Sequence, residues 1–237
     1  MTIHSTYIMK KFATIATVLF FSGILFSHAQ DAAPRVSPSP LPRQHFPARL
    51  GPDVAVMEIQ VGKEKKKLKR VVIGLYDNMA PQTVANFKEL INKKFYDGIR
   101  FHRLIGKTLV QTGDPLSRSR SPLRAGTGGP GYTLPAEIRS KIGRGALAMA
   151  RLPDTSNPTR ASNGSQFFVL LTPSPSLEGR YTVFGEILDG LDELDEISTM
   201  STDSNDFPLQ NISIRSMIIL PRSSPEAAPQ VPTTKKR

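Results

Sequence analysis

Apolar and polar residues alternate in the central part of the chain, as they do in β-strands that bury one face. From Met57 to Val61 the alternation is strict, and an apolar run over 71–76 follows a charged stretch. Two such runs on either side of a polar turn predict a β-hairpin. Similar patterns predict five further strands, over residues 104–110, 146–150, 167–171, 182–187 and 212–220.

Two segments instead have the spacing of an amphipathic helix. Pro81 suits the first turn of a helix, and apolar residues recur after it at Val84, Phe87, Ile91 and Phe95. A weaker helical pattern covers 191–200. Many strands and two helices predict a mainly β domain, either a barrel or a sandwich whose openings the helices cover.

The first 29 residues have the pattern of a signal peptide. Lys10-Lys11 precede an uncharged apolar segment over 12–26, and Ser27-His28-Ala29 place small residues where a signal peptidase cleaves after Ala29. The alternative is a membrane anchor, but the apolar segment is shorter than the roughly 20 residues that span a bilayer. We therefore expect an exported protein, periplasmic or secreted, with no transmembrane anchor after cleavage.

Composition divides the remainder into three parts. Residues 30–50 are rich in proline and polar residues and predict an extended linker. Residues 222–237 have a similar composition and predict a disordered tail, which leaves 51–221 as a single folded domain. The chain has no cysteine, so disulfides, thiol nucleophiles and thiolate metal sites are excluded.

Charge changes this picture little. Lys and Arg number 31 against 20 Asp and Glu, a net charge of +11. The basic stretch 63–70 has no aromatic residues that could stack on bases. We interpret it as a solvated hairpin turn with a charged edge, and we expect no nucleic-acid partner.

The common catalytic groups are scarce. His102 is the only histidine between 51 and 221, and no G-x-S-x-G sequence accompanies it. A packed structural histidine is therefore the favoured interpretation, and no metal site is expected. Residues 126–131, GTGGPG, match a dinucleotide-binding pattern, but no helical pattern follows them, so we predict a turn and no cofactor.

Several short motifs occur together in a fixed order. They are FHR (101–103), QTGD (111–114), GTGGPGY (126–132), SNGSQFF (162–168) and LEGRYTVFG (177–185). In this order they resemble the cyclophilin-type peptidyl-prolyl isomerases, over about residues 54–220. The longer segment 145–168 is similar to bacterial members in particular.

The resemblance implies a cyclophilin-like barrel of eight antiparallel strands capped by two α-helices. It also implies a monomer that needs no cofactor, that binds proline-containing polypeptides and that speeds rotation about X-Pro bonds to assist folding. By resemblance, Arg103 is the hydrogen-bond donor to the prolyl nitrogen, and Gln111 holds this arginine and the substrate backbone. The implied substrate contacts are Leu109, Phe168 and Leu177 for the proline ring, with Tyr181 beside them, and Ala150 and Gln166 for the residues before proline.

The sequence departs from the family pattern at four positions near this site. They are Thr108 for a common phenylalanine, Arg151 for an asparagine, Ser176 for a tryptophan and Tyr181 for a histidine. We expect these changes to slow catalysis. The alternatives are a binding module without useful turnover and, for Arg103 itself, a structural ion pair with Asp114.

Overall fold

The computed structural model describes residues 47–62, 68–119 and 125–228. The chain divides into residues 1–42 and 43–237, and everything described belongs to the second unit. The predicted signal peptide, most of the predicted linker and the basic residues 63–67 lie outside the described residues. No helix in the described ranges is both long and apolar enough to cross a membrane.

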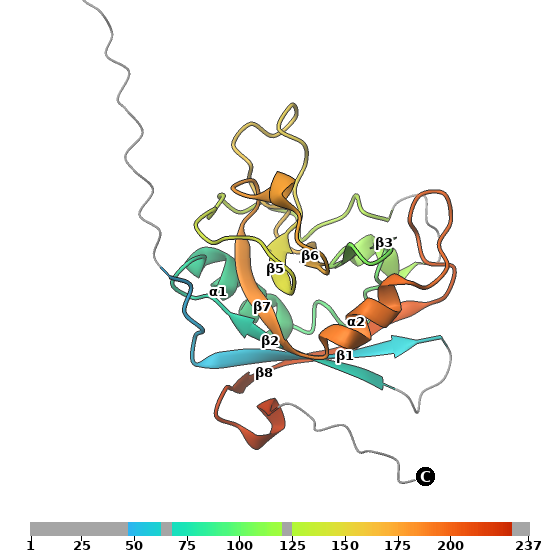
Figure 1. Cartoon of the computed structure of the whole chain (residues 1–237), viewed down its shortest axis with the longest axis horizontal. Coiled ribbons are helices and arrows are strands. Elements are labelled where there is room, and N and C mark those ends of the chain that lie inside the picture. The colour runs from blue at the N-terminus through green and yellow to red at the C-terminus, as the bar shows by residue number, and fades with distance from the viewer. Residues whose placement is uncertain (1–46, 63–67, 120–124, 229–237) are drawn as a thin grey trace, which may run out of the picture. The chain divides into compact units, whose positions relative to one another are not determined.

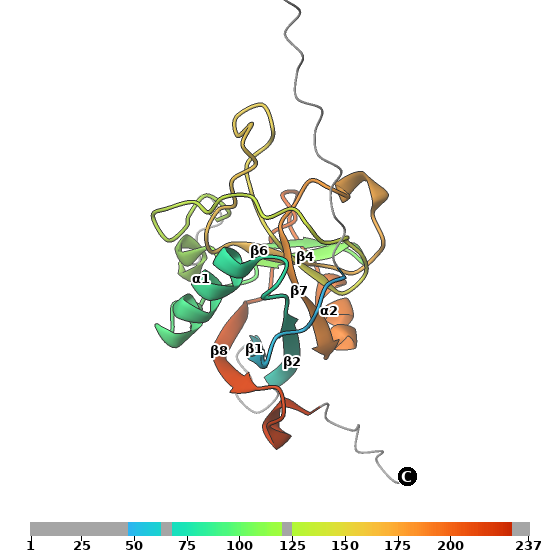
Figure 2. The same cartoon turned by 90° about the vertical axis from the view of Figure 1, so that its left-hand side faces the viewer.

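Eight antiparallel strands form one curled sheet (Figures 1 and 2). They are β1 (Asp53–Val61), β2 (Leu68–Leu75), β3 (Arg103–Ile105), β4 (Leu109–Thr112), β5 (Ala146–Met149), β6 (Phe167–Leu170), β7 (Val183–Asp189) and β8 (Ile212–Pro221). Their order across the sheet is β3-β4-β6-β5-β7-β2-β1-β8. The predicted hairpin is confirmed, because β1 and β2 pair with Met57 opposite Val71.

The two edge strands of the sheet, β3 and β8, are joined through the residues just before β3. The N–H of Phe101 donates to the carbonyl of Ile212 at 2.9 Å, and the N–H of Ile214 donates to the carbonyl of Ile99 at 2.8 Å. Residues 99–101 therefore join the β3 end to β8, and the sheet closes around one apolar core. The predicted fold class, mainly β with eight antiparallel strands and two helices, is confirmed.

One predicted strand is wrong in its bounds. Residues 104–110 were expected to form a single strand, but they divide into β3 and β4 around a turn at 106–108. The N–H of Thr108 donates to the carbonyl of Ile105, and Lys107 adopts a positive φ of 54°. The apolar residues on both sides of the turn continue one β-like pattern, so the pattern alone does not reveal the turn.

Two helices cover the sheet on different sides (Figure 2). Helix α1 (Pro81–Asn92) buries Val84, Phe87 and Ile91, as their spacing predicts. Phe95 was expected to extend this pattern but lies beyond the end of the helix. Helix α2 (Leu191–Ser198) buries Leu194 and Ile197.

Helix α1 receives its N-terminal cap from a distant loop. Ala80, which precedes it, has no side chain that can accept a hydrogen bond. The carboxylate of Glu137 takes this role: it accepts from the N–H of Thr83 at 2.9 Å and from the Thr83 hydroxyl at 2.8 Å. Glu137 is only 2% exposed, so the carboxylate and the groups it satisfies are hidden from water.

We expect Glu137→Ala to lower the free energy of unfolding by about 2–3 kcal/mol, because it leaves helix donors and a buried hydroxyl unsatisfied. Glu137→Gln keeps one acceptor oxygen and should cost about 1 kcal/mol. Urea denaturation followed by circular dichroism measures both. Equal midpoints for Glu137→Ala and wild type would mean that another group caps the helix.

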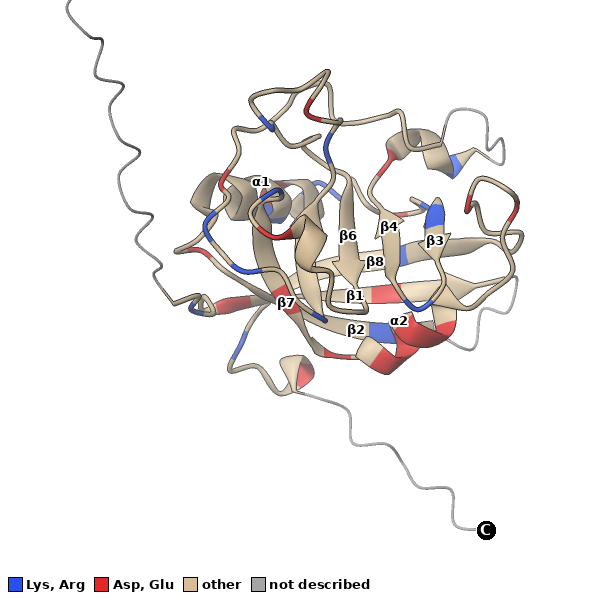
Figure 3. Ribbon diagram, turned by 45° about the horizontal axis from the view of Figure 1, so that its top comes forward, with Lys and Arg blue, Asp and Glu red and all other residues tan. Residues whose placement is uncertain are grey.

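Acidic residues of α2 are paired with basic residues of neighbouring segments (Figure 3). Lys69 on β2 contacts Glu193 and lies 2.7 Å from a carboxylate oxygen of Glu196. Arg144 binds Asp195 through both terminal nitrogens. Lys69, at the end of the basic stretch 63–70, is therefore paired with acidic residues of α2.

The chain does not become disordered at residue 222. A short 3-10 helix, η4, covers Pro225–Ala227, and Ala227 is buried against Val54, Val56 and Val72 on the outer face of the sheet. The prediction of a disordered tail is therefore wrong for residues 222–228. Its proline-rich composition resembles that of a disordered segment, but the single methyl group of Ala227 is enough to cover a small apolar strip.

Candidate active site

A single row of side chains crosses the outer face of the sheet. Arg103 on β3 lies opposite Gln111 on β4, and Gln111 lies opposite Phe168 on β6. Residues directly opposite one another in antiparallel strands point to the same face. The row continues through Ala148 on β5 to Val183 on β7. The fold thus brings an arginine, an amide and an aromatic ring side by side from strands that are distant in sequence.

Phe168 lies at the centre of a small apolar cluster outside the main core. The buried members are Ala146, Ala148, Phe168 and Val183, and the partly buried side chains against them include Leu109, Leu177 and Tyr181. The Tyr181 ring meets Phe168 edge to face, with centroids 5.3 Å apart. A 3-10 helix, η3 (Pro175–Leu177), supplies Leu177. Four of the six predicted substrate contacts therefore form one apolar surface.

The other two predicted contacts lie beside this surface. The Gln166 side chain is buried and donates to the carbonyls of Gly126 and Gly128 at 3.0 and 2.7 Å. Its oxygen accepts from Nε2 of Gln111 at 3.0 Å. The backbone N–H of Ala150 donates to the carbonyl of Gln166. The predicted turn at 126–131 thus has a clear role, since its carbonyls hold the Gln166 amide.

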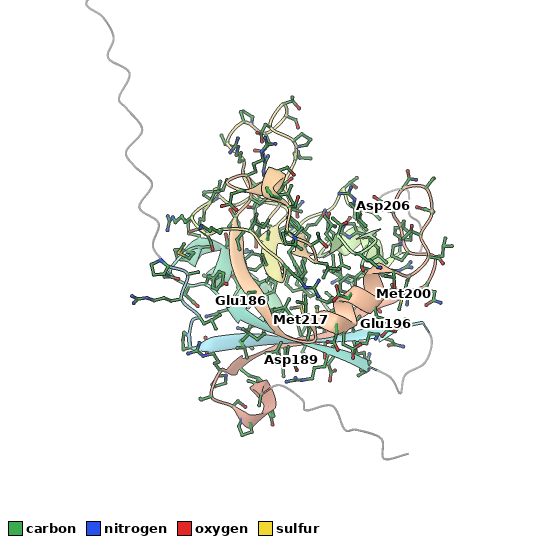
Figure 4. The ribbon with its side chains drawn as sticks, in the orientation of Figure 1. Glu186, Asp189, Glu196, Met200, Asp206 and Met217 are labelled. Carbon is green, nitrogen blue, oxygen red and sulfur yellow. The ribbon has the colours of Figure 1, made fainter. Side chains whose placement is uncertain are left out.

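Arg103 has a partner that the sequence did not suggest. Its Nε lies 3.3 Å from Oδ2 of Asp206, and both side chains are about half exposed, at 47% and 43%. Asp206 belongs to the loop between α2 and β8 (Figure 4), and its carbonyl accepts from the N–H of Leu104 on β3. Within the described ranges, the two terminal nitrogens of Arg103 have no hydrogen-bond partner, so they can donate to a ligand.

The alternative ion pair between Arg103 and Asp114 is not formed: the Asp114 carboxylate accepts from the N–H of Leu116 at 2.7 Å and from the N–H groups of Gly126 and Gly128. Gln111 lies opposite Arg103 and donates its amide to Gln166. That Gln111 holds the arginine through its side-chain oxygen stays a prediction. No sequence signal marks Asp206, since only the folded loop brings it beside β3.

His102 lies next to this row but points inward. It is 5% exposed. Burial lowers the pKa of its imidazole below the usual range, and the nearby Asp114 carboxylate opposes this shift. The ring is therefore neutral at pH 7, as suits a packed side chain.

We expect the free energy of unfolding to fall as the pH is lowered from about 7 to about 5. In this window the unfolded chain binds a proton at His102, near an ordinary pKa of about 6.5, before the folded protein does. The slope from this group can reach at most about 1.4 kcal/mol per pH unit. Urea denaturation at several pH values measures it.

His102→Gln is the matched control, because it should flatten this slope while leaving Arg103 and Gln111 in place. His102 is the only histidine in the described residues, so no other imidazole contributes there. The same slope in His102→Gln and wild type would contradict the assignment.

The chemistry available at this surface is hydrogen bonding beside an apolar cluster. No group of three His, Asp or Glu side chains in the described part of the chain is arranged to hold a metal ion. Arg103 instead lies in the same cross-strand row as Phe168 of the apolar cluster. Such a surface can hold an apolar ring and donate hydrogen bonds to an atom beside it.

Comparison with known proteins defines the class to which this fold and surface belong. The family model described as "Cyclophilin type peptidyl-prolyl cis-trans isomerase/CLD" matches residues 56–219, well over half of the 237 residues. The chain belongs to the cyclophilin family and is a peptidyl-prolyl cis-trans isomerase that works without a cofactor. The predicted family and reaction are confirmed.

Relatives come from several kingdoms. Peptidyl-prolyl cis-trans isomerase ppi1 of Schizosaccharomyces pombe is 36% identical over 156 residues, covering 65% of this chain and 94% of the relative. Peptidyl-prolyl cis-trans isomerase B of Bacillus subtilis is 41% identical over 125 residues, covering 52% and 78%. Peptidyl-prolyl cis-trans isomerase-like 1 of Homo sapiens is 36% identical over 148 residues, covering 61% and 82%. These relatives do not single out a bacterial exported subclass.

Solved structures agree with the family. Two crystal structures of a cyclophilin type peptidyl-prolyl cis-trans isomerase from Cryptosporidium parvum match with TM-scores of 0.58, at 26% and 27% identity. Each match covers 70% of this chain and 98% of the other. One of the two was determined in the presence of the dipeptide Ala-Pro.

Proposed function

We propose that the row Arg103–Gln111–Phe168 is the active site at which this isomerase rotates X-Pro bonds. The observation that carries the proposal is the cross-strand register, which places a half-exposed arginine and a buried aromatic ring on one face. The proline ring would lie against Phe168, Leu109, Leu177 and Tyr181. Ala150 and Gln166 would contact the residues before proline.

Arg103 supplies the selective stabilisation in this proposal. Rotating a peptide bond means losing amide resonance, against a barrier of roughly 18–20 kcal/mol. In the twisted amide the prolyl nitrogen regains a lone pair, which a fixed donor can bind. The guanidinium offers rigid N–H donors and stays charged at any ordinary pH. Because the donor binds the twisted amide and neither planar form, it lowers the barrier without breaking a covalent bond.

The apolar surface contributes by excluding water. The planar amide is the more charge-separated form, so it loses more than the twisted form when it is desolvated. Phe168 and Tyr181 provide the rings for such an environment. Gln111 is held to Gln166, so its amide is fixed beside the path of the substrate backbone.

We further propose that the substrates are polypeptides that fold outside the cytoplasm, and that the protein acts there as a monomer. Lys10-Lys11, the apolar segment 12–26 and the small residues before Gln30 support export. Mass spectrometry of the protein from its cell of origin tests this. We expect a mature chain that begins at Gln30, in the exported fraction. An intact first segment in the cytoplasm would contradict export.

Exchange spectroscopy by NMR on an Ala-Pro-Phe peptide tests the reaction at this site. Uncatalysed X-Pro exchange takes roughly tens to hundreds of seconds, so catalytic amounts of enzyme should produce exchange cross-peaks that are otherwise absent. The peptide should also shift the resonances of Phe168 and Tyr181. Binding without faster exchange would support a binding module instead.

A further inference from the structure

Residues 151–161 form a long loop that follows β5 and extends away from the sheet (Figures 1 and 2). Two arginines fasten it to the segment that follows η3. Nε of Arg151 donates to the carbonyl of Arg180 at 2.8 Å, and Nη1 of Arg160 donates to the carbonyl of Gly179 at 3.1 Å. Asp154 lies between the two arginines, 2.6 Å from Arg151 and 3.0 Å from Arg160. Hydrogen bonds to two backbone carbonyls therefore tie the loop to residues 179–180, and the ion pairs with Asp154 connect the two arginines within the loop.

Only one of these arginines touches the candidate pocket. The Arg151 side chain is 5% exposed, and its Cζ lies 4.9 Å from the centroid of the Tyr181 ring. The same ring meets Phe168 edge to face, with an interplanar angle of 88°. The guanidinium, the tyrosine and the phenylalanine therefore form a continuous stack. Arg151 and Tyr181, two departures from the family pattern, contact each other in this structure.

We propose that Arg151 is a positioning residue that clamps Tyr181 against Phe168 and so fixes one wall of the proline pocket. This inference rests on the proposed function of that surface. Asp154 neutralises the charge of Arg151 locally, so the arginine acts on the ring and does not attract the substrate. A desolvated guanidinium over an aromatic face is the strong form of a cation–π contact. The fixed ring is ready to receive proline without first being ordered.

Arg151→Met tests the clamp, because it keeps an apolar stem and removes the guanidinium. The expected result is a KM for an Ala-Pro-Phe peptide raised about fivefold, with kcat unchanged, which corresponds to the loss of one partly desolvated cation–π contact. A fall in kcat with KM unchanged would overturn the proposal, since a wall of the pocket acts on binding and not on the rotation itself.

Arg160→Met is the matched control. It removes the other ion pair to Asp154 and the other bond to the 179–180 segment. Among the described residues, the arginine that stacks on the Tyr181 ring is Arg151 and not Arg160. We expect it to leave KM at the wild-type value. If Arg160→Met raises KM as much as Arg151→Met, general loosening of the loop explains both and the clamp is refuted. Thermal unfolding of both variants shows whether each is folded.

A double-mutant comparison locates the effect at the ring. In a Tyr181→Phe background, which keeps an aromatic ring, Arg151→Met should still raise KM. In a Tyr181→Leu background it should add nothing, because the ring that it positions is gone. Equal effects in both backgrounds would overturn the proposal. Arg103→Ala separates the proposed active site from the proposed clamp. If Arg103→Ala leaves exchange intact, the proposed active site is wrong. If Arg103→Ala abolishes exchange but Arg151→Met leaves peptide binding unaltered, only the clamp is refuted.

Discussion

Arg103→Ala is expected to lower kcat for X-Pro exchange by about a hundredfold to a thousandfold, the range seen when one preorganised transition-state donor is removed. In the proposed mechanism, the arginine donates to the prolyl nitrogen only when the amide is twisted. Peptide affinity should therefore change much less than kcat. Exchange spectroscopy measures the rate, and a titration of the same peptide measures its affinity.

Two controls separate this loss from damage to the fold. The Arg103–Asp206 pair is about half exposed, and such pairs contribute at most about 1 kcal/mol, so the unfolding midpoint of Arg103→Ala should be close to wild type. Arg215→Ala removes another exposed arginine, on β8, and should leave exchange unchanged. Fast exchange in Arg103→Ala would mean that a different residue provides the donor.

Gly113→Ala is expected to lower the free energy of unfolding by at least ~3 kcal/mol, through left-handed strain and a backbone clash together. Gly113 has a φ of +91°, and a Cβ there would lie 2.2 Å from the carbonyl oxygen of Ser165. Neither backbone can give way without separating the end of β4 from residues 165–166. The hydrogen bond from Gln111 to Gln166 joins the same two segments. Separating them would break this bond in the proposed active site, so peptide exchange should be lost along with stability.

Gly98→Ala provides the matched comparison. Gly98 also has a positive φ, +76°, but a Cβ there would meet nothing within 4 Å. The free energy of unfolding should fall only by the cost of a left-handed backbone conformation, about 1 kcal/mol. Peptide exchange should persist. Urea denaturation of the two variants measures the difference. Similar losses in both would show that the approach of Gly113 to Ser165 is not tight in solution.

Elements with local signals could be predicted from the sequence. The strict alternation from Met57 to Val61 predicts a strand, because side chains in a strand point alternately to the two faces. Pro81 and the spacing of Val84, Phe87 and Ile91 predict helix α1 for a similar local reason. The order of several short motifs indicated the family, and with it the reaction. Arg103 and Gln111 were identified as site residues through the same resemblance.

Contacts between distant segments could not be predicted in this way. Glu137 caps α1, Asp206 pairs with Arg103, and Ala227 covers the strip around Val54, yet nothing near these residues in the sequence indicates their partners. Each pairing depends on where a loop is placed after the sheet has closed. From side-chain chemistry alone, many donors in the chain could pair with any one carboxylate.

The sequence by itself thus determined most of the elements and the family, and it named Arg103 as the donor that we propose. Periodicity and motif order depend on residues that are near one another in the sequence, so they can be recognised without knowing the fold. Only the tertiary structure decided that Asp206 pairs with Arg103, and that Arg151 stacks on Tyr181. The physical reason is that hydrogen bonds and ring contacts act over a few ångströms, and curling of the sheet decides which groups come that close.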